Sequence, residues 1–177
     1  MIGSRRFFMV ATALVVPSLA VAQGKLQIPD KWYGVRVEGN AFTVEMPGIP
    51  DHKILNDVSA RGTAFALHSY SLEAGGNSFV AQTALFPADV EYREPRRVLQ
   101  SALDNRAKQL NGGKWTRTDW REIGGAAAVE STGTLTSGSG LRQLVVVKEK
   151  RFVSLAFMGP NTGGPDANRF FKSLKLN

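Results

Sequence analysis

The chain has 177 residues, with 22 lysines and arginines against 15 aspartates and glutamates, and it has no cysteine. The lack of cysteine excludes disulfides, thiolate metal sites, a cysteine nucleophile and a lipid-modified cysteine. Acidic residues are interspersed with the densest basic group, at residues 93–108, which favours a solvated helix face over a nucleic-acid surface.

The first 22 residues have the layout of a secretory signal peptide. Arg5 and Arg6 precede an apolar run of ten residues, which is too short for the roughly 20 residues that a bilayer span needs. Ala20 and Ala22 form an A-x-A site, so cleavage is expected before Gln23. The stretch SRRFFM resembles the twin-arginine consensus, although an ordinary Sec leader with arginines remains the alternative.

Cleavage would leave residues 23–177 as a single domain. Its 155 residues are enough for one ordinary core, and 20 basic residues remain once the two leader arginines are removed from 22. The mature chain would then carry a net charge of +5 and no stable membrane anchor. We expect a soluble periplasmic protein.

Alternation of apolar and polar residues predicts a series of strands before residue 90. Strands are expected near 33–37 and 41–46 as a hairpin across Gly39-Asn40, with a weaker one at 53–58. Two longer strands lie within 62–74 and 77–87, and Gly75-Gly76 between them favours a tight hairpin.

One long amphipathic helix is expected to follow. Pro95 can open it, apolar residues recur at spacings of three and four up to Leu110, and Asn111-Gly112-Gly113 ends it. Asp104 and Lys108 are four residues apart on its polar side, which predicts a favourable pair.

Four further strands are predicted at 114–123, 126–135, 141–150 and 151–159. The last two are apolar on both alternating sets, which is typical of central strands covered on both sides. A short C-terminal helix is expected to begin with Asp166 as its N-cap. This order predicts an α+β fold with a predominantly antiparallel sheet and a helix for each face.

These residues resemble a known group of exported bacterial proteins. The stretches FTVEMPGIP, FALHSYSLE, GAAAVE (Gly125 to Glu130) and DANRFFKSLKL, with the central helix ending in Gly-Gly, look like the Mog1/PsbP-like fold. The resemblance implies an α/β/α sandwich over most of residues 35–176. It implies binding and accessory roles and carries over no functional residue.

The chemistry-bearing residues indicate no catalytic, cofactor or metal site. His52 and His68 are the only histidines, and we expect them on different strands without a carboxylate at a ligand spacing. His68 and Tyr70 should point the same way and either form a half-buried strand pair or contact a ligand. The stretch SGSG at 137–140 is expected to be a hairpin turn rather than part of a nucleophile motif.

A strand with tryptophans and arginines is more suggestive. By alternation Trp115, Arg117, Asp119 and Arg121 share one face and can form a shallow surface for an anionic ligand or a polysaccharide. In the alternative, Trp120 lies in the core, Trp115 lies at its edge, and the arginines are solvated or paired with Asp119.

The sequence thus favours an exported, non-catalytic binding or accessory protein whose partner is a protein, a small molecule or an envelope ligand. One alternative is a periplasmic hydrolase that uses His68 with a serine and a carboxylate brought together by the fold. The other is a carrier with an apolar cavity between the sheet and the helices.

Overall fold

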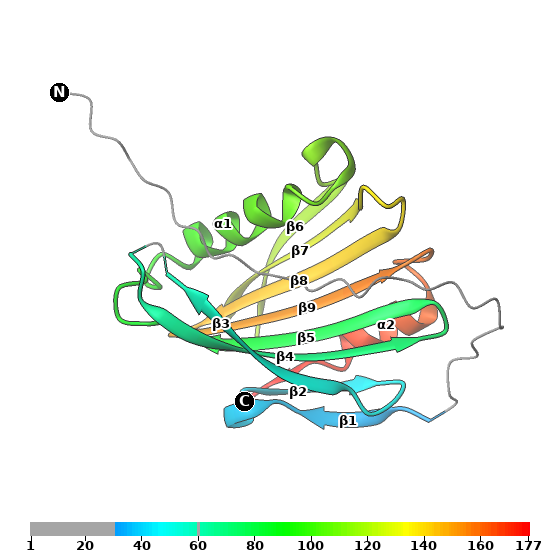
Figure 1. Cartoon of the computed structure of the whole chain (residues 1–177), viewed down its shortest axis with the longest axis horizontal. Coiled ribbons are helices and arrows are strands. Elements are labelled where there is room, and N and C mark those ends of the chain that lie inside the picture. Colours follow the sequence, from blue (N-terminus) through cyan, green and yellow to red (C-terminus); the bar gives the residue numbers. More distant parts are fainter. Residues whose placement is uncertain (1–30, 60) are drawn as a thin grey trace.

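The computed structural model describes residues 31–59 and 61–177, and the expected leader residues Arg5, Arg6, Ala20 and Ala22 lie outside them. The fold is α+β and mostly antiparallel, as expected (Figure 1). A seven-stranded sheet, here the large sheet, has the order β3-β4-β5-β9-β8-β7-β6. A small sheet has the order β1-β2-β10.

The strands of the large sheet follow the predicted segments closely. They are β3 (Asp51–Val58), β4 (Ala64–Ala74), β5 (Asn77–Leu85), β6 (Arg117–Ile123), β7 (Ala126–Thr134), β8 (Gly140–Lys148) and β9 (Arg151–Gly159). The β4–β5 hairpin turns on Gly75 and Gly76, whose φ values are 60° and 76°. Positive φ is readily adopted only by glycine, which explains the pair at this turn.

The small sheet begins with the predicted hairpin. Strands β1 (Tyr33–Arg36) and β2 (Phe42–Met46) are joined by the 3-10 turn η1 (Glu38–Asn40), and β10 (Lys175–Leu176) pairs with the other edge of β2. The sequence analysis did not separate this hairpin from the main sheet.

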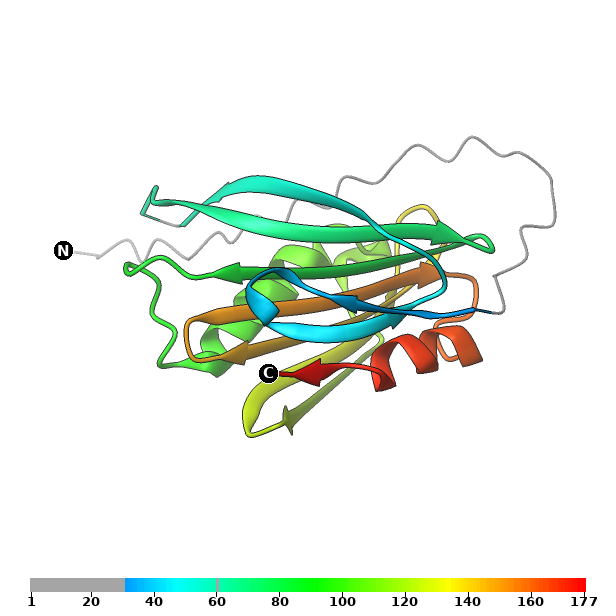
Figure 2. The same cartoon turned by 90° about the horizontal axis from the view of Figure 1, so that it is seen from below.

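The two faces of the large sheet are covered differently (Figure 2). Helix α1 (Pro95–Ala107) packs on one face, here the helix face, around Leu99 and Val145. The small sheet and helix α2 (Pro165–Lys172) cover the other, here the small-sheet face, around Phe42, Phe79 and Phe170. Each face does have a helix, as expected, but α2 shares its layer with the small sheet, which the sequence analysis did not predict.

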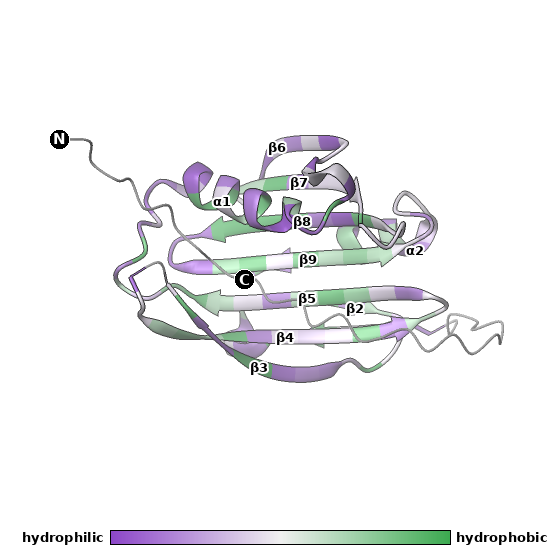
Figure 3. Cartoon of the chain, turned by 45° about the horizontal axis from the view of Figure 1, so that its top comes forward, coloured by the Kyte–Doolittle hydropathy of each residue, from purple (hydrophilic) through white to green (hydrophobic). Residues whose placement is uncertain are grey.

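Strands β8 and β9 lie at the centre of the large sheet and are buried on both faces, as their apolar sequences predict. Figure 3 shows the contrast, with β9 largely apolar and the edge strands β3 and β6 largely polar. None of the helices among the described residues is long and apolar enough to cross a bilayer.

Three local expectations about the helices were wrong. Helix α1 ends at Ala107, because the chain then turns into the 3-10 segment η2 (Asn111–Gly113). Asp104 accepts a hydrogen bond from Gln100 and Lys108 donates to Asn105, so each of the two predicted partners instead bonds to a neutral side chain. The N-cap of α2 is Gly164, because Pro165 occupies the first helical position and moves Asp166 into the first turn.

Candidate functional site: an arginine pocket on the small-sheet face

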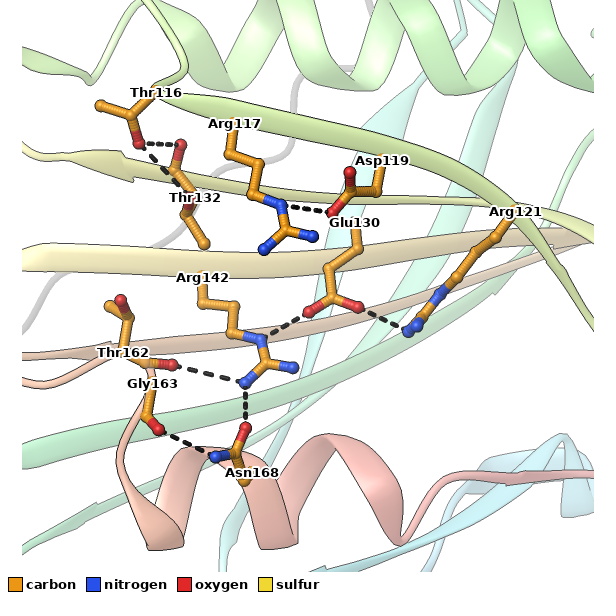
Figure 4. A network of polar contacts seen from close by, with 10 residues as sticks. All are labelled: Thr116, Arg117, Asp119, Arg121, Glu130, Thr132, Arg142, Thr162, Gly163 and Asn168. Atoms are coloured by element: carbon orange, nitrogen blue, oxygen red, sulfur yellow. Dashed lines mark hydrogen bonds and ion pairs between the residues drawn. The ribbon is translucent and has the colours of Figure 1, made fainter.

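A polar pocket of about 360 Å³ lies beside the N-terminus of α2 (Figure 4). Strand register explains its composition, because Arg117 of β6 is opposite Thr132 of β7, which is opposite Arg142 of β8. Asp119 and Glu130 form the next row of the same face. We call this site the arginine pocket; its lining includes Arg117, Asp119, Arg121, Glu130, Thr132, Arg142, Thr162, Gly163 and Asn168.

Glu130 is the centre of the pocket's hydrogen-bond network. Its carboxylate oxygens lie 2.6 Å from Arg121 Nη2 and 2.6 Å from Arg142 Nε. The side chains of Glu130 and Arg142 are only 13% and 15% exposed, so this pair is shielded from water more than a surface ion pair. One carboxylate therefore holds two guanidinium groups on the same face of the sheet.

Arg142 is fixed by further contacts. Its Nη1 donates to Asn168 Oδ1 at 2.8 Å and to the Thr162 carbonyl at 3.4 Å, and its guanidinium lies 4.4 Å from the centre of the Phe171 ring. These contacts link the sheet to the start of α2. The Arg142 guanidinium is therefore oriented before any ligand arrives.

Arg117 lies at the open side of the pocket. Its Nε pairs with Asp119 at 2.7 Å, and the two side chains are 73% and 47% exposed. An exposed pair of this kind contributes little stability. Figure 4 shows its terminal nitrogens without a partner among the residues drawn, so they can donate to a ligand without breaking a buried contact.

The charges of the pocket do not cancel. Three arginines face two carboxylates, which leaves one positive charge on a concave, partly shielded surface. Arginine presents several N–H groups in a planar fork that matches carboxylate and phosphate oxygens. The pocket can therefore hold a small anion, with Thr132 between the two flanking arginines.

The sequence predicted the part of this pocket that β6 contributes. Arg117, Asp119 and Arg121 share one face as predicted, but Trp115 does not join them. Trp115 precedes β6 and lies on the helix face, where its Nε1 donates to the Leu103 carbonyl at 3.2 Å. The strand alternation does not extend back to Trp115 because β6 begins at Arg117.

Trp120 packs partly buried against the apolar cluster beneath α1, close to the alternative expectation of a core position. Arg96 of α1 lies 4.5 Å from the centre of its ring. This tryptophan is on the opposite face from the arginine pocket, so it contributes nothing to a binding surface there.

Glu130, Arg142 and Asn168 were not singled out from the sequence. Arg142 and Glu130 are on neighbouring strands but twelve residues apart, and Asn168 comes from a helix. The alternation of β7 and β8 places a charged residue among apolar ones, Glu130 after Ala128 and Arg142 before Leu144. Those isolated charges were the one signal that pointed to a site.

The two histidines come together on adjacent strands of the small-sheet face. His52 Nε2 lies 3.2 Å from His68 Nδ1, and the His52 ring stacks on Tyr70 with centroids 4.3 Å apart. Neither histidine has a hydrogen bond to a serine or a carboxylate among the described residues. His68 also lines a second cleft of about 280 Å³ with Glu38, Thr83 and Arg151.

The end of β3 and the loop after β5 contain two carboxyl groups, Asp57, which is buried, and Asp89, which is partly buried. Ser59 donates its hydroxyl to Asp89, and this hydrogen bond lowers the pKa of the Asp89 carboxyl. Burial raises the pKa of Asp57, although the Val58 N–H donates to its carboxylate. Among the described residues, no group of three or more histidine, aspartate or glutamate side chains is arranged to hold a metal ion.

No family model matches the chain, and no curated protein is similar to it. The site must therefore be interpreted from its own geometry.

Proposed function

We propose that this chain is an exported, non-catalytic binding protein that holds a small anionic ligand in the arginine pocket. The observation that carries the proposal is the fixed guanidinium of Arg142 beside the exposed guanidinium of Arg117, in a pocket of about 360 Å³ with one uncompensated positive charge. Carboxylate and phosphate groups are the ligands that this donor arrangement favours.

Export to the periplasm is part of the same proposal and rests on the sequence. The support is the layout of residues 1–22, in particular Arg5 and Arg6 before the apolar run and Ala20 and Ala22 at its end. The resemblance to exported proteins with a Mog1/PsbP-like fold agrees with this compartment and with a binding or accessory role.

The alternatives have less support. A hydrolase based on His68 needs a nucleophile and a carboxylate within hydrogen-bond reach, whereas the described contacts join His68 to His52. An apolar carrier needs a large apolar cavity, whereas charged and polar side chains make up most of the arginine pocket. The second cleft has apolar residues such as Ala84 and Leu85, but Glu38, His68 and Arg151 line it as well.

Calorimetric titration with inorganic phosphate, citrate and glucose tests the ligand class. We expect the two anions to bind and the neutral sugar not to bind. Because a hydrogen bond to a charged group contributes about 1.5–3 kcal/mol, Arg117→Gln and Arg121→Gln should each weaken anion binding about tenfold or more. Arg97→Gln, an exposed arginine on α1, is the matched control.

Equal anion binding by the unaltered protein and both pocket variants would contradict the proposal, as would an equal loss of anion binding in the Arg97 control.

Native mass spectrometry of protein recovered gently from its own cells tests the compartment and the retained ligand together. A mature mass beginning at Gln23 supports export, and a full-length mass contradicts it. Loss of export when Arg5 and Arg6 are both changed to lysine would support the twin-arginine route.

A further inference from the structure

Two imidazoles meet on the small-sheet face, at the opposite end of the large sheet from the arginine pocket. His52 of β3 and His68 of β4 are diagonal neighbours, because His52 is opposite Tyr70 and His68 is opposite Ile54. Their facing nitrogens are 3.2 Å apart and their ring planes differ by 14°. Only one of these two nitrogens can carry the shared hydrogen, so the other presents a lone pair.

The pair is held in place by its neighbours. The His52 ring lies on the Tyr70 ring with an interplanar angle of 9°, and the Tyr70 hydroxyl accepts a hydrogen bond from the Glu38 N–H at 3.0 Å. Ligands that are already held close together lose less conformational entropy on binding. His52 is nevertheless exposed to solvent, and His68 opens into the cleft of about 280 Å³.

The separation of the nitrogens matches the needs of a metal ion. Two imidazole nitrogens at about 2.0–2.1 Å from a tetrahedral ion are about 3.3–3.4 Å apart, which is close to the 3.2 Å found here. Metal binding requires that the two rings turn from this hydrogen-bonded arrangement until both lone pairs point at the ion. The shared hydrogen then moves to the outer nitrogen of its own ring through exchange with water, which leaves both facing nitrogens able to coordinate.

We propose that His52 and His68 form a two-histidine site for a divalent transition-metal ion. The described residues supply two protein ligands, so the remaining coordination positions face solvent and the cleft and are filled by water or by a bound molecule. Imidazole nitrogens favour late transition metals, and for a given site the affinity is highest for Cu²⁺ and lower for Ni²⁺ and Zn²⁺. Mg²⁺ and Ca²⁺, which prefer oxygen ligands, are not expected to bind.

The composition of the chain allows an unambiguous test of metal binding by these two residues. These are its only two histidines and it has no cysteine, so imidazole coordination can come from no other residue. The untagged protein is titrated with CuCl₂ in a calorimeter, and the bound Cu²⁺ is examined by electron paramagnetic resonance. We expect one ion per chain and hyperfine structure from two imidazole nitrogens; a spectrum with one imidazole nitrogen or none overturns the proposal.

Single variants distinguish a chelate from two separate sites. His52→Ala and His68→Ala should each lower Cu²⁺ affinity more than about tenfold, because even loss of a residue that only orients a metal ligand costs 10- to 100-fold. Each single variant should bind as weakly as the double variant. Asn56→Ala, an exposed change on the same face of β3, should leave binding unchanged.

Retention of full binding by either single variant would overturn the chelate. The spectrum of the unaltered protein decides the question even if a variant fails to fold. This site is separate from the arginine pocket, so neither result bears on anion binding.

Discussion

Arg106 is a buried arginine with unpartnered nitrogens, and replacing it with methionine is expected to stabilise the protein. Its side chain lies beneath α1 and is 2% exposed, and its Nη1 donates to Gln109 Oε1 at 3.0 Å. Its Nε and Nη2 have no hydrogen-bond partner among the described residues.

The magnitude follows from the cost of burial. Removal from water lowers the pKa of the Arg106 guanidinium to about 10. Lowering the pKa from the usual value of an arginine to about 10 corresponds to roughly 3 kcal/mol of unfavourable free energy for the charged form. Loss of the bond to Gln109 offsets about 1 kcal/mol of this, because Gln109 is only partly buried and water can replace the donor.

We therefore expect Arg106→Met to raise the free energy of unfolding by about 2 kcal/mol and Tm by about 4–8 °C. A depressed pKa of a base destabilises the fold below that pKa, and the penalty disappears as the pH rises through it and above the unfolded value. The gain should therefore be constant between pH 6 and 8.

Urea unfolding followed by circular dichroism measures the difference, with Arg97→Met, an exposed position on the same helix, as the control. The control should change stability by less than about 0.5 kcal/mol. A loss of more than about 1 kcal/mol in Arg106→Met would refute the reasoning, because it would show that the guanidinium is well hydrogen-bonded in the fold.

Two further substitutions test the packing and the titration. In Gly140→Ala the new Cβ would lie 2.9 Å from the Gly159 carbonyl oxygen, so urea unfolding should show a loss of stability of about 1–3 kcal/mol. The control Gly34→Ala has open space around the new Cβ and should be close to neutral. Equal effects of the two substitutions would contradict the packing argument. Asp57→Asn should be more stable than the unaltered protein at pH 7 and no more stable at pH 3. The reason is that burial raises the pKa of the folded carboxyl above 3.8, so this group destabilises the fold only when it is ionised. A gain in stability that persists at pH 3 would contradict this cause.

Local sequence patterns were sufficient to locate the helices and strands but not to predict which strands pair with one another. Alternation located every strand of the large sheet, and the spacing of Val98, Leu99 and Ala102 located α1, because burial on one face leaves a periodic signal. The same patterns could not show that β1 and β2 form a separate sheet with β10. That pairing joins residues 42 and 176, and no local period reports on it.

The candidate site shows the same division. Alternation along β6 predicted that Arg117, Asp119 and Arg121 share a face, since it depends only on neighbouring residues of one strand. Their partners Glu130 and Arg142 required the register between three strands, and Asn168 required the position of α2.

The two histidines show most clearly what the sequence alone could and could not predict. The sequence determined that there are only two of them and that they would lie on different strands. Only the tertiary structure decided that those strands are adjacent and that the register leaves the two ring nitrogens 3.2 Å apart. Composition and period are properties of short stretches of chain, whereas pairing register is set by turns and by packing of the whole sheet, which bring together residues that are distant in sequence.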